Sequence, residues 1–110
     1  NDMHWSWLKY VFIHMEGKCD TTTSGSPTFN VGLTYHTGGN NLYHELFIEK
    51  SISVCCGNTA NLNIQLDVNK IFNGASQTVD PVTESVTNTD DYPVIASKVT
   101  ENFANAFSLQ

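Results

Sequence analysis

Apolar and polar residues alternate along several stretches of the chain with the two-residue period of a β-strand. This pattern predicts strands over 7–16, 28–36, 42–50 and 61–68. The first stretch is apolar on both faces, which is typical of a well-covered strand, whereas the clearest alternation, at 61–68, predicts one buried and one exposed face. The Gly/Asn segment 38–41 lies between the second and third stretches and predicts a hairpin that joins them.

The period changes to that of a helix near the C-terminus. Ile95, Val99 and Phe103 recur at helical spacing, and Pro93 suits a first helical turn. We therefore expect one C-terminal helix over about 94–107.

These elements predict one domain over residues 1–110 with a mainly β fold. The stretch 69–75 predicts a short helical turn, and 76–92 is rich in loop-forming residues. We expect an antiparallel, β-sandwich-like domain whose first strands lie upstream of Asn1, with the one C-terminal helix. A small sheet with a helix across one face is the alternative.

Composition and charge narrow the functional classes. Charged residues make up 15% of the chain, the net charge is −6, and all five basic residues are lysines. Nucleic-acid binding needs a basic stripe, usually with Arg, so we exclude that partner, and no apolar run is long enough to predict a transmembrane segment. Motifs for a catalytic nucleophile, a phosphate loop or a dinucleotide are absent from the sequence, so we expect a protein that is not an enzyme.

Four histidines carry the clearest potential for metal chemistry. His4 and His36 lie in polar or Gly-rich surroundings near strand ends, and imidazole is the commonest protein ligand for copper and zinc. If the first two strands are antiparallel neighbours, these two rings converge at one end of the sheet. His44 falls on the apolar side of its stretch, which favours a buried structural role, and His14 beside Glu16 is interpreted as a surface or edge residue.

Several segments together resemble the MbnP family, which comprises exported bacterial proteins linked to methanobactin and copper, with copper-binding relatives of the MopE and CorA type. The resemblance rests on Met3-His4-Trp5-Ser6-Trp7 followed by Tyr10-Val11-Phe12 and Glu16-Gly17, on Phe29 with Tyr35-His36-Thr37-Gly38-Gly39, and on the segments 62–72 and 102–107. It spans nearly the whole chain but corresponds to the C-terminal part of the family domain.

The resemblance implies an exported protein, in the periplasm, at the outer-membrane surface or outside the cell, that binds copper. Copper-binding members use histidines together with a kynurenine derived from tryptophan, and of these residues only His4 and His36 match histidines in the family's segments. Trp5 and Trp7 are the nearest candidates for a shielding or modified aromatic residue, and such shielding favours Cu(I). The alternative function is a non-catalytic cell-surface or assembly module without metal, whose polar Thr and Asn faces contact other protein subunits or glycans.

The chain has three cysteines, an odd number that leaves at least one thiol without an internal partner. Free thiols are one interpretation. Because an exported protein meets an oxidising compartment, we predict a disulfide from Cys19 to either Cys55 or Cys56. A bridge between the adjacent Cys55 and Cys56 is disfavoured by its geometry.

Overall fold

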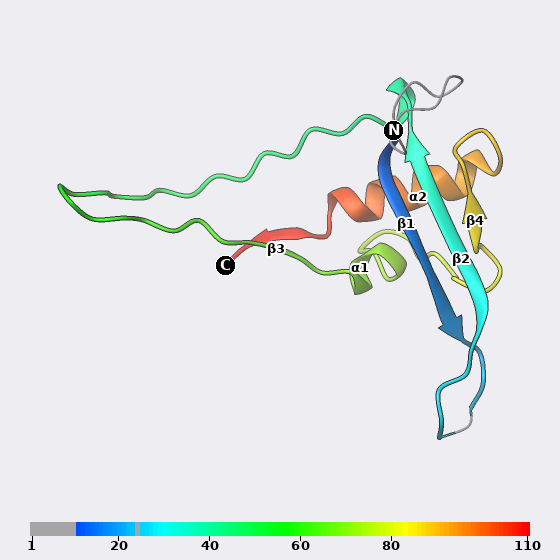
Figure 1. Cartoon of the computed structure of the whole chain (residues 1–110). Helices are drawn as coiled ribbons and strands as arrows, with labels where there is room; N and C mark the ends of the chain where they lie inside the picture. The colour runs from blue at the N-terminus through cyan, green and yellow to red at the C-terminus, as the bar shows by residue number, and fades with distance from the viewer. Residues whose placement is uncertain (1–10, 24) are drawn as a thin grey trace.

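Two long antiparallel strands form the centre of the structure, a computed structural model that describes residues 11–23 and 25–110. β1 (Val11–Asp20) pairs with β2 (Phe29–Gly38) over almost their whole length (Figure 1). β4 (Val86–Thr87) is a short strand that lies parallel to β2 on its other side, so the order in this sheet is β1-β2-β4. β2 is therefore the central strand of the sheet.

α2 (Pro93–Ala104) packs against one face of this sheet (Figure 1). Tyr92, with a left-handed φ of 60°, turns the chain into the helix, and Pro93 occupies the first helical turn. Alternate side chains of β1 and β2 meet the apolar side of α2 because a strand presents every second residue to the same face. The core cluster consists of Leu33, Tyr35, Ile71, Val79 and Val99.

A second, two-stranded sheet lies beside the first. β3 (Ile64–Leu66) pairs antiparallel with β5 (Phe107–Leu109), which follows α2 directly. The remaining elements are the short helix α1 (Asn69–Phe72) and the 3-10 turn η1 (Asn40–Leu42).

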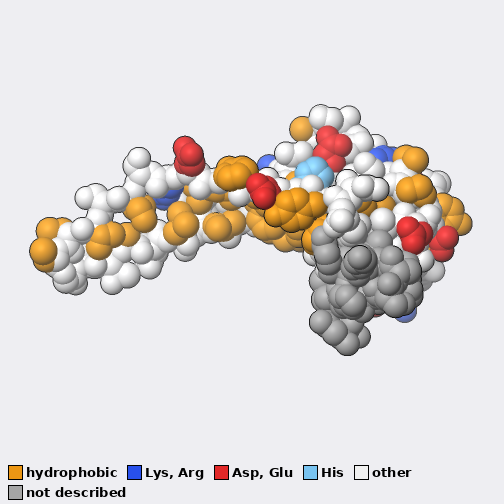
Figure 2. Space-filling model, turned by 90° about the horizontal axis from the view of Figure 1, so that it is seen from above, with side chains coloured by type: hydrophobic (Ala, Val, Ile, Leu, Met, Phe, Trp, Pro, Cys, Tyr) orange, Lys and Arg blue, Asp and Glu red, His pale blue; other side chains and the backbone are white. Residues whose placement is uncertain are grey.

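Residues 44–63, which we call the arm, run out from the body and back again (Figures 1 and 2). The chain reverses through a turn in which the N–H of Asn58 donates to the carbonyl of Cys55 at 2.9 Å, with Gly57 at φ 78°. The radius of gyration is 17.3 Å, whereas a compact chain of this length has about 13 Å. The arm accounts for this excess because it makes the molecule 54 Å long.

The structure confirms a mainly β fold of two mostly antiparallel sheets with one helix near the C-terminus. It also confirms the short helical turn within 69–75, and it meets the condition that the first two predicted strands are antiparallel neighbours. The predicted helix ends at Ala104 instead of 107, because Phe107 begins a strand that pairs with β3.

The predicted hairpin between 28–36 and 42–50 is wrong. β4 and Thr89 occupy the second edge of β2 between Thr34 and Gly38, next to the turn where the hairpin would begin, and segment 42–50 instead forms the outgoing limb of the arm. The predicted strand 61–68 is shortened to Ile64–Leu66, the length over which β5 offers a partner. Residues 7–10 of the first predicted strand lie outside the described residues.

Candidate metal centre

The outer face of the β1–β2 pair carries the side chains with metal-binding chemistry. Ile13, Leu33 and Tyr35 point toward the core and are buried, so the residues between them along each strand face outward. The register pairs His14 with His36 directly across the two strands. Glu16 lies two residues from His14 on the same strand, and therefore on the same face.

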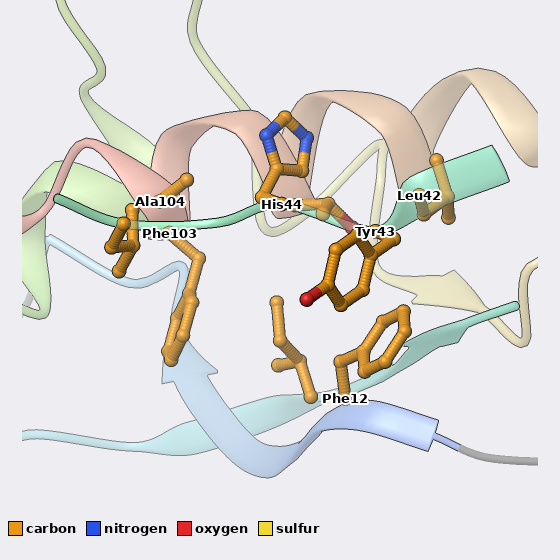
Figure 3. Close-up of a pocket in the computed structure, with 9 residues that line it drawn as sticks. Phe12, Leu42, Tyr43, His44, Phe103 and Ala104 are labelled. Carbon is orange, nitrogen blue, oxygen red and sulfur yellow. The ribbon is translucent and has the colours of Figure 1, made fainter. Parts of the chain in front are cut away.

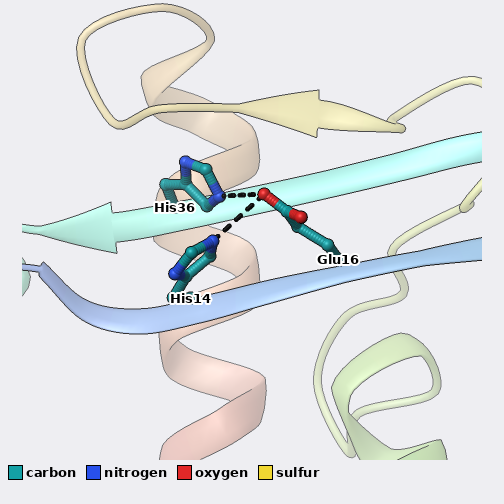
Figure 4. Close-up of side chains that lie close together, drawn as sticks. All are labelled: His14, Glu16 and His36. Carbon is teal, nitrogen blue, oxygen red and sulfur yellow. Dashed lines mark hydrogen bonds and ion pairs between the residues drawn. The ribbon is translucent and has the colours of Figure 1, made fainter. Parts of the chain in front are cut away.

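These three side chains converge on one point (Figure 4). Oε1 of Glu16 lies 3.0 Å from Nε2 of His14 and 3.0 Å from Nε2 of His36. The two imidazole rings stand edge to face, with their centroids 4.1 Å apart. One potential ligand atom from each residue lies within 4.8 Å of the other two. Among the described residues, His14, Glu16 and His36 are the group of three His, Cys, Asp or Glu side chains that lie this close together.

The charge of Glu16 is stabilised by the two rings. Hydrogen bonds, first from His14 and then from His36, lower the pKa of the Glu16 carboxyl below its ordinary value. The carboxylate is thus ionised at neutral pH. The side chain of His36 is 16% exposed, that of His14 is 32% exposed, and that of Glu16 is 60% exposed, so the site is open to solvent on the side of its carboxylate.

The backbone of His36 is held from both sides. On one side β1 provides its ladder partner. On the other, Oγ1 of Thr89 donates to the carbonyl of His36 at 3.1 Å and accepts from the N–H of Gly38 at 3.1 Å, so this side chain continues the edge beyond the short strand β4. The Thr89 backbone has a φ of 80°, a conformation that non-glycine residues seldom adopt and that positions its hydroxyl here.

Two imidazole nitrogens and one carboxylate oxygen form a donor set suited to copper or zinc. Ligand atoms about 2 Å from one ion lie at most about 4 Å apart. The present separations are close to that limit, so small rotations of the side chains would bring all three onto one ion. The donor set is unsuited to calcium, which takes six or more oxygen ligands.

The sequence-predicted pair His4 and His36 is described only in part. His4, Trp5 and Trp7 lie outside the described residues, and their part in a site stays a prediction. His36 belongs to the cluster, but with a partner that the sequence analysis interpreted as a surface or edge residue. The signal that could have found His14 is its spacing from Glu16, since two residues along a strand place both side chains on one face.

His44 is exposed and not buried, so its predicted structural role in the core is wrong. It lies at the root of the arm, where Tyr43 packs on Phe12 with ring centroids 5.8 Å apart and the His44 ring points away from them (Figure 3). A small, mostly apolar pocket of about 120 Å³ lies there, bounded also by Phe103 of α2. Among the described residues, His44 belongs to no group of side chains that could hold a metal ion.

The three cysteines carry free thiols in this structure. Cys19 is half-buried and its Sγ lies 3.9 Å from the carbonyl oxygen of Pro81, whereas Cys55 and Cys56 are exposed in the turn of the arm. The bridge from Cys19 to one of them stays a prediction for the oxidised protein.

Comparisons with known proteins give one family. The family model described as MbnP matches residues 1–90. The curated proteins contain no match, and neither do the solved structures. Within the described part of the chain, no helix combines the length and the apolar character needed to cross a membrane.

Proposed function

Because the chain belongs to the MbnP family, which is associated with methanobactin and copper, we propose that it is an exported copper-binding protein that holds the ion through His14, Glu16 and His36. The proposed role is binding and not catalysis.

The observation that supports this proposal is the cross-strand pairing of two histidines around one carboxylate. Both Nε2 atoms lie 3.0 Å from the same oxygen of Glu16. A cation placed among these three atoms would take over the position in which protons now link the rings to the carboxylate. Copper binding would therefore release protons and weaken as the pH falls, because a ligand nitrogen must be free of its proton.

The donor set bears on the oxidation state of the ion. Imidazole suits both Cu(I) and Cu(II), but a carboxylate oxygen is a hard ligand and favours Cu(II). Cu(I), which the tryptophan shielding predicts, would need Trp5 or Trp7 to cover the open side of the site. His4 is a candidate for an additional ligand, and all three residues keep these roles as predictions.

Isothermal titration with Cu(II) in a weakly coordinating buffer tests the proposal. We expect one ion per wild-type chain. His14→Ala and His36→Ala should each weaken binding by at least about tenfold, the lower end of the effect of disturbing a metal site. Glu16→Gln removes the charge but keeps the shape, so it should weaken binding while the fold remains intact.

His44→Ala is the matched control, since it removes an exposed histidine that belongs to no ligand cluster among the described residues. It should leave affinity and stoichiometry unchanged. Wild-type affinity in both His14→Ala and His36→Ala would contradict the proposed site. Loss of binding in His4→Ala and His36→Ala, with normal binding in His14→Ala, would replace it with the pair expected from the sequence.

A further inference from the structure

The outgoing limb of the arm has the pattern of a half-buried strand but lies in solvent. Leu46, Ile48, Ile52 and Val54 share one face, and Lys50 is the charged residue among them. Their exposed fractions lie between 39% and 58%. The alternation is typical of a strand with one buried face, and within residues 11–23 and 25–110 no surface covers that face.

The backbone of the arm is also largely unpaired. Among the described residues, the backbone hydrogen bond inside the arm is the one that closes the turn from Asn58 to Cys55. The arm is held to the C-terminus at two points: Nζ of Lys50 donates to the carbonyl of Gln110 at 3.1 Å, and the N–H of Gln110 donates to the carbonyl of Asn63 at 2.9 Å. Extended backbone with free donors and acceptors is the usual template for adding a strand from another chain.

The arm and the residues that follow it expose many large hydrophobic side chains. Six large hydrophobic side chains of the arm are exposed: Leu46, Phe47, Ile48, Ile52, Val54 and Leu62. Three more follow within 64–68. At roughly 200 Å² each and about half exposure, these nine side chains together expose on the order of 900 Å², spread over both faces of the arm and over 64–68. A stable dimer buries about 800 Å² on each partner.

A groove of complementary character lies on the body of the same molecule. β1 pairs with β2 along one edge and β3 pairs with β5 along one edge, so β1 and β3 each keep an edge that no described strand occupies. Between them is a groove of about 540 Å³ lined mainly by apolar residues, among them Phe12, Leu66, Val68 and Phe103. The apolar floor, beside strand edges that no described strand pairs with, fits an extended strand with one apolar face.

We propose that two copies of this chain form a reciprocal dimer in which the arm of each copy lies as an added β-strand in the groove of the other. The same arm and the same groove occur on both copies, so a two-fold axis satisfies both contacts at once. The other face of the limb, which carries Glu45 and Glu49 and also the exposed Phe47, remains in solvent. The net charge of the chain is −6, but no Asp or Glu lines the groove. The acidic residues of the arm therefore meet no like charge among the residues that line the groove.

The test is the mass of the protein in solution, measured by sedimentation velocity and by light scattering after size exclusion. Reductant keeps Cys55 and Cys56 from cross-linking, and a chelator removes any metal that could bridge two chains. We expect wild type at twice the 12.2 kDa of one chain at micromolar concentration. Ile52→Asp places a charge on the apolar face of the arm and should raise the dimer dissociation constant at least tenfold.

Ser53→Asp is the matched control because it adds the same charge one residue along, on the opposite face of the limb. It should leave the dimer intact. Val68→Asp charges the groove and should also dissociate the dimer, while circular dichroism verifies that both variants remain folded. Mixing Ile52→Asp with Val68→Asp should restore a heterodimer, since one chain keeps a good groove and the other a good arm.

A monomeric wild type under these conditions would overturn the proposal. So would equal effects of Ile52→Asp and Ser53→Asp, because the contact would then not depend on the apolar face. Failure of the mixed pair to associate, with both single variants folded, would exclude the exchange of arm and groove.

Discussion

Asn102 on α2 fastens the segment after α1 to the helix, and Gly74 lies directly against it. The Asn102 side chain is buried, and its Nδ2 donates to the carbonyl of Ile71 at 2.9 Å and to that of Gln77 at 3.2 Å. A Cβ atom at residue 74 would lie 2.0 Å from Oδ1 of Asn102. The φ of Gly74 is not positive, so alanine suits the backbone there, and the three atoms nearest to its Cβ all belong to the Asn102 amide.

Asn102→Ala removes the donor and leaves a buried carbonyl without a partner. A buried acceptor left unpaired costs about 1–3 kcal/mol, so we expect a loss of about 2 kcal/mol. At roughly 4–8 °C per kcal/mol for a domain of this size, the Tm falls by about 10 °C. Gly74→Ala pushes the same amide out of place, so it should cost about as much.

The two changes should not add. The three atoms nearest to a Cβ at residue 74 all belong to Asn102, so once Asn102 is alanine, Gly74→Ala should be close to neutral, or stabilising by up to about 1 kcal/mol through the unfolded chain. The double variant should therefore be about as stable as Asn102→Ala alone, with a coupling energy of about 2 kcal/mol.

Urea unfolding followed by circular dichroism measures all four free energies of unfolding. Asn105→Ala is the control: Nδ2 of Asn105 also donates to a backbone carbonyl, that of Glu101 at 3.0 Å, but at an exposed position at the end of the same helix. It should cost no more than about 0.5 kcal/mol. An equal cost of Gly74→Ala in the presence and absence of Asn102 would refute the reasoning.

Two further predictions concern pH. Hydrogen bonds from Lys98 and from the backbone N–H of Asp80 lower the pKa of Glu84, so its stabilisation is present above the ordinary carboxyl pKa and is lost as the pH falls through the lowered value. Between about pH 6 and pH 3 the free energy of unfolding of Glu84→Gln should therefore fall by about 0.5 kcal/mol less than that of wild type, the scale of a partly exposed ion pair. The same fall in both proteins would contradict this. Burial raises the pKa of Tyr35 to about 12, and its hydroxyl donates to the carbonyl of Glu84 at 2.7 Å. The folded chain should lose stability as the pH rises above about 10, and absorbance titration should show one tyrosine ionising last, a step that Tyr35→Phe removes.

The sequence predicted those parts of the fold whose residues carry a local signal and also find a partner. The period of 28–36 and the change of period at Pro93 both correspond to real elements, β2 and α2. Segment 42–50 has an equally good strand period, yet it pairs with no described strand, because β4 and Thr89 occupy the β2 edge next to the turn. The alternation of apolar and polar residues predicts which face of a strand is suited to burial. It does not predict which neighbouring strand or surface covers that face.

The candidate site was predicted only in part for a similar reason. His36 could be chosen from its surroundings in the sequence, but its relation to His14 depends on the register between two strands, which no local pattern of either strand fixes. The hairpin register is set over the whole length of β1 and β2. The spacing of His14 and Glu16 is visible in the sequence, and the third ligand is visible only across the strands.

Because the register places His14 opposite His36, an ion bound at this site would cross-link β1 to β2. An ion held by both would close a loop of about 20 residues, a constraint that in a chain-entropy account is worth about 3 kcal/mol against opening of the hairpin. Each departure of the ion would let β1 part from β2 more readily, since β1 has no second neighbour among the described strands. The amide hydrogens between β1 and β2 would then exchange more slowly when the site holds copper than when it is empty. Hydrogen-exchange mass spectrometry would thus report the copper supply without detecting the metal itself.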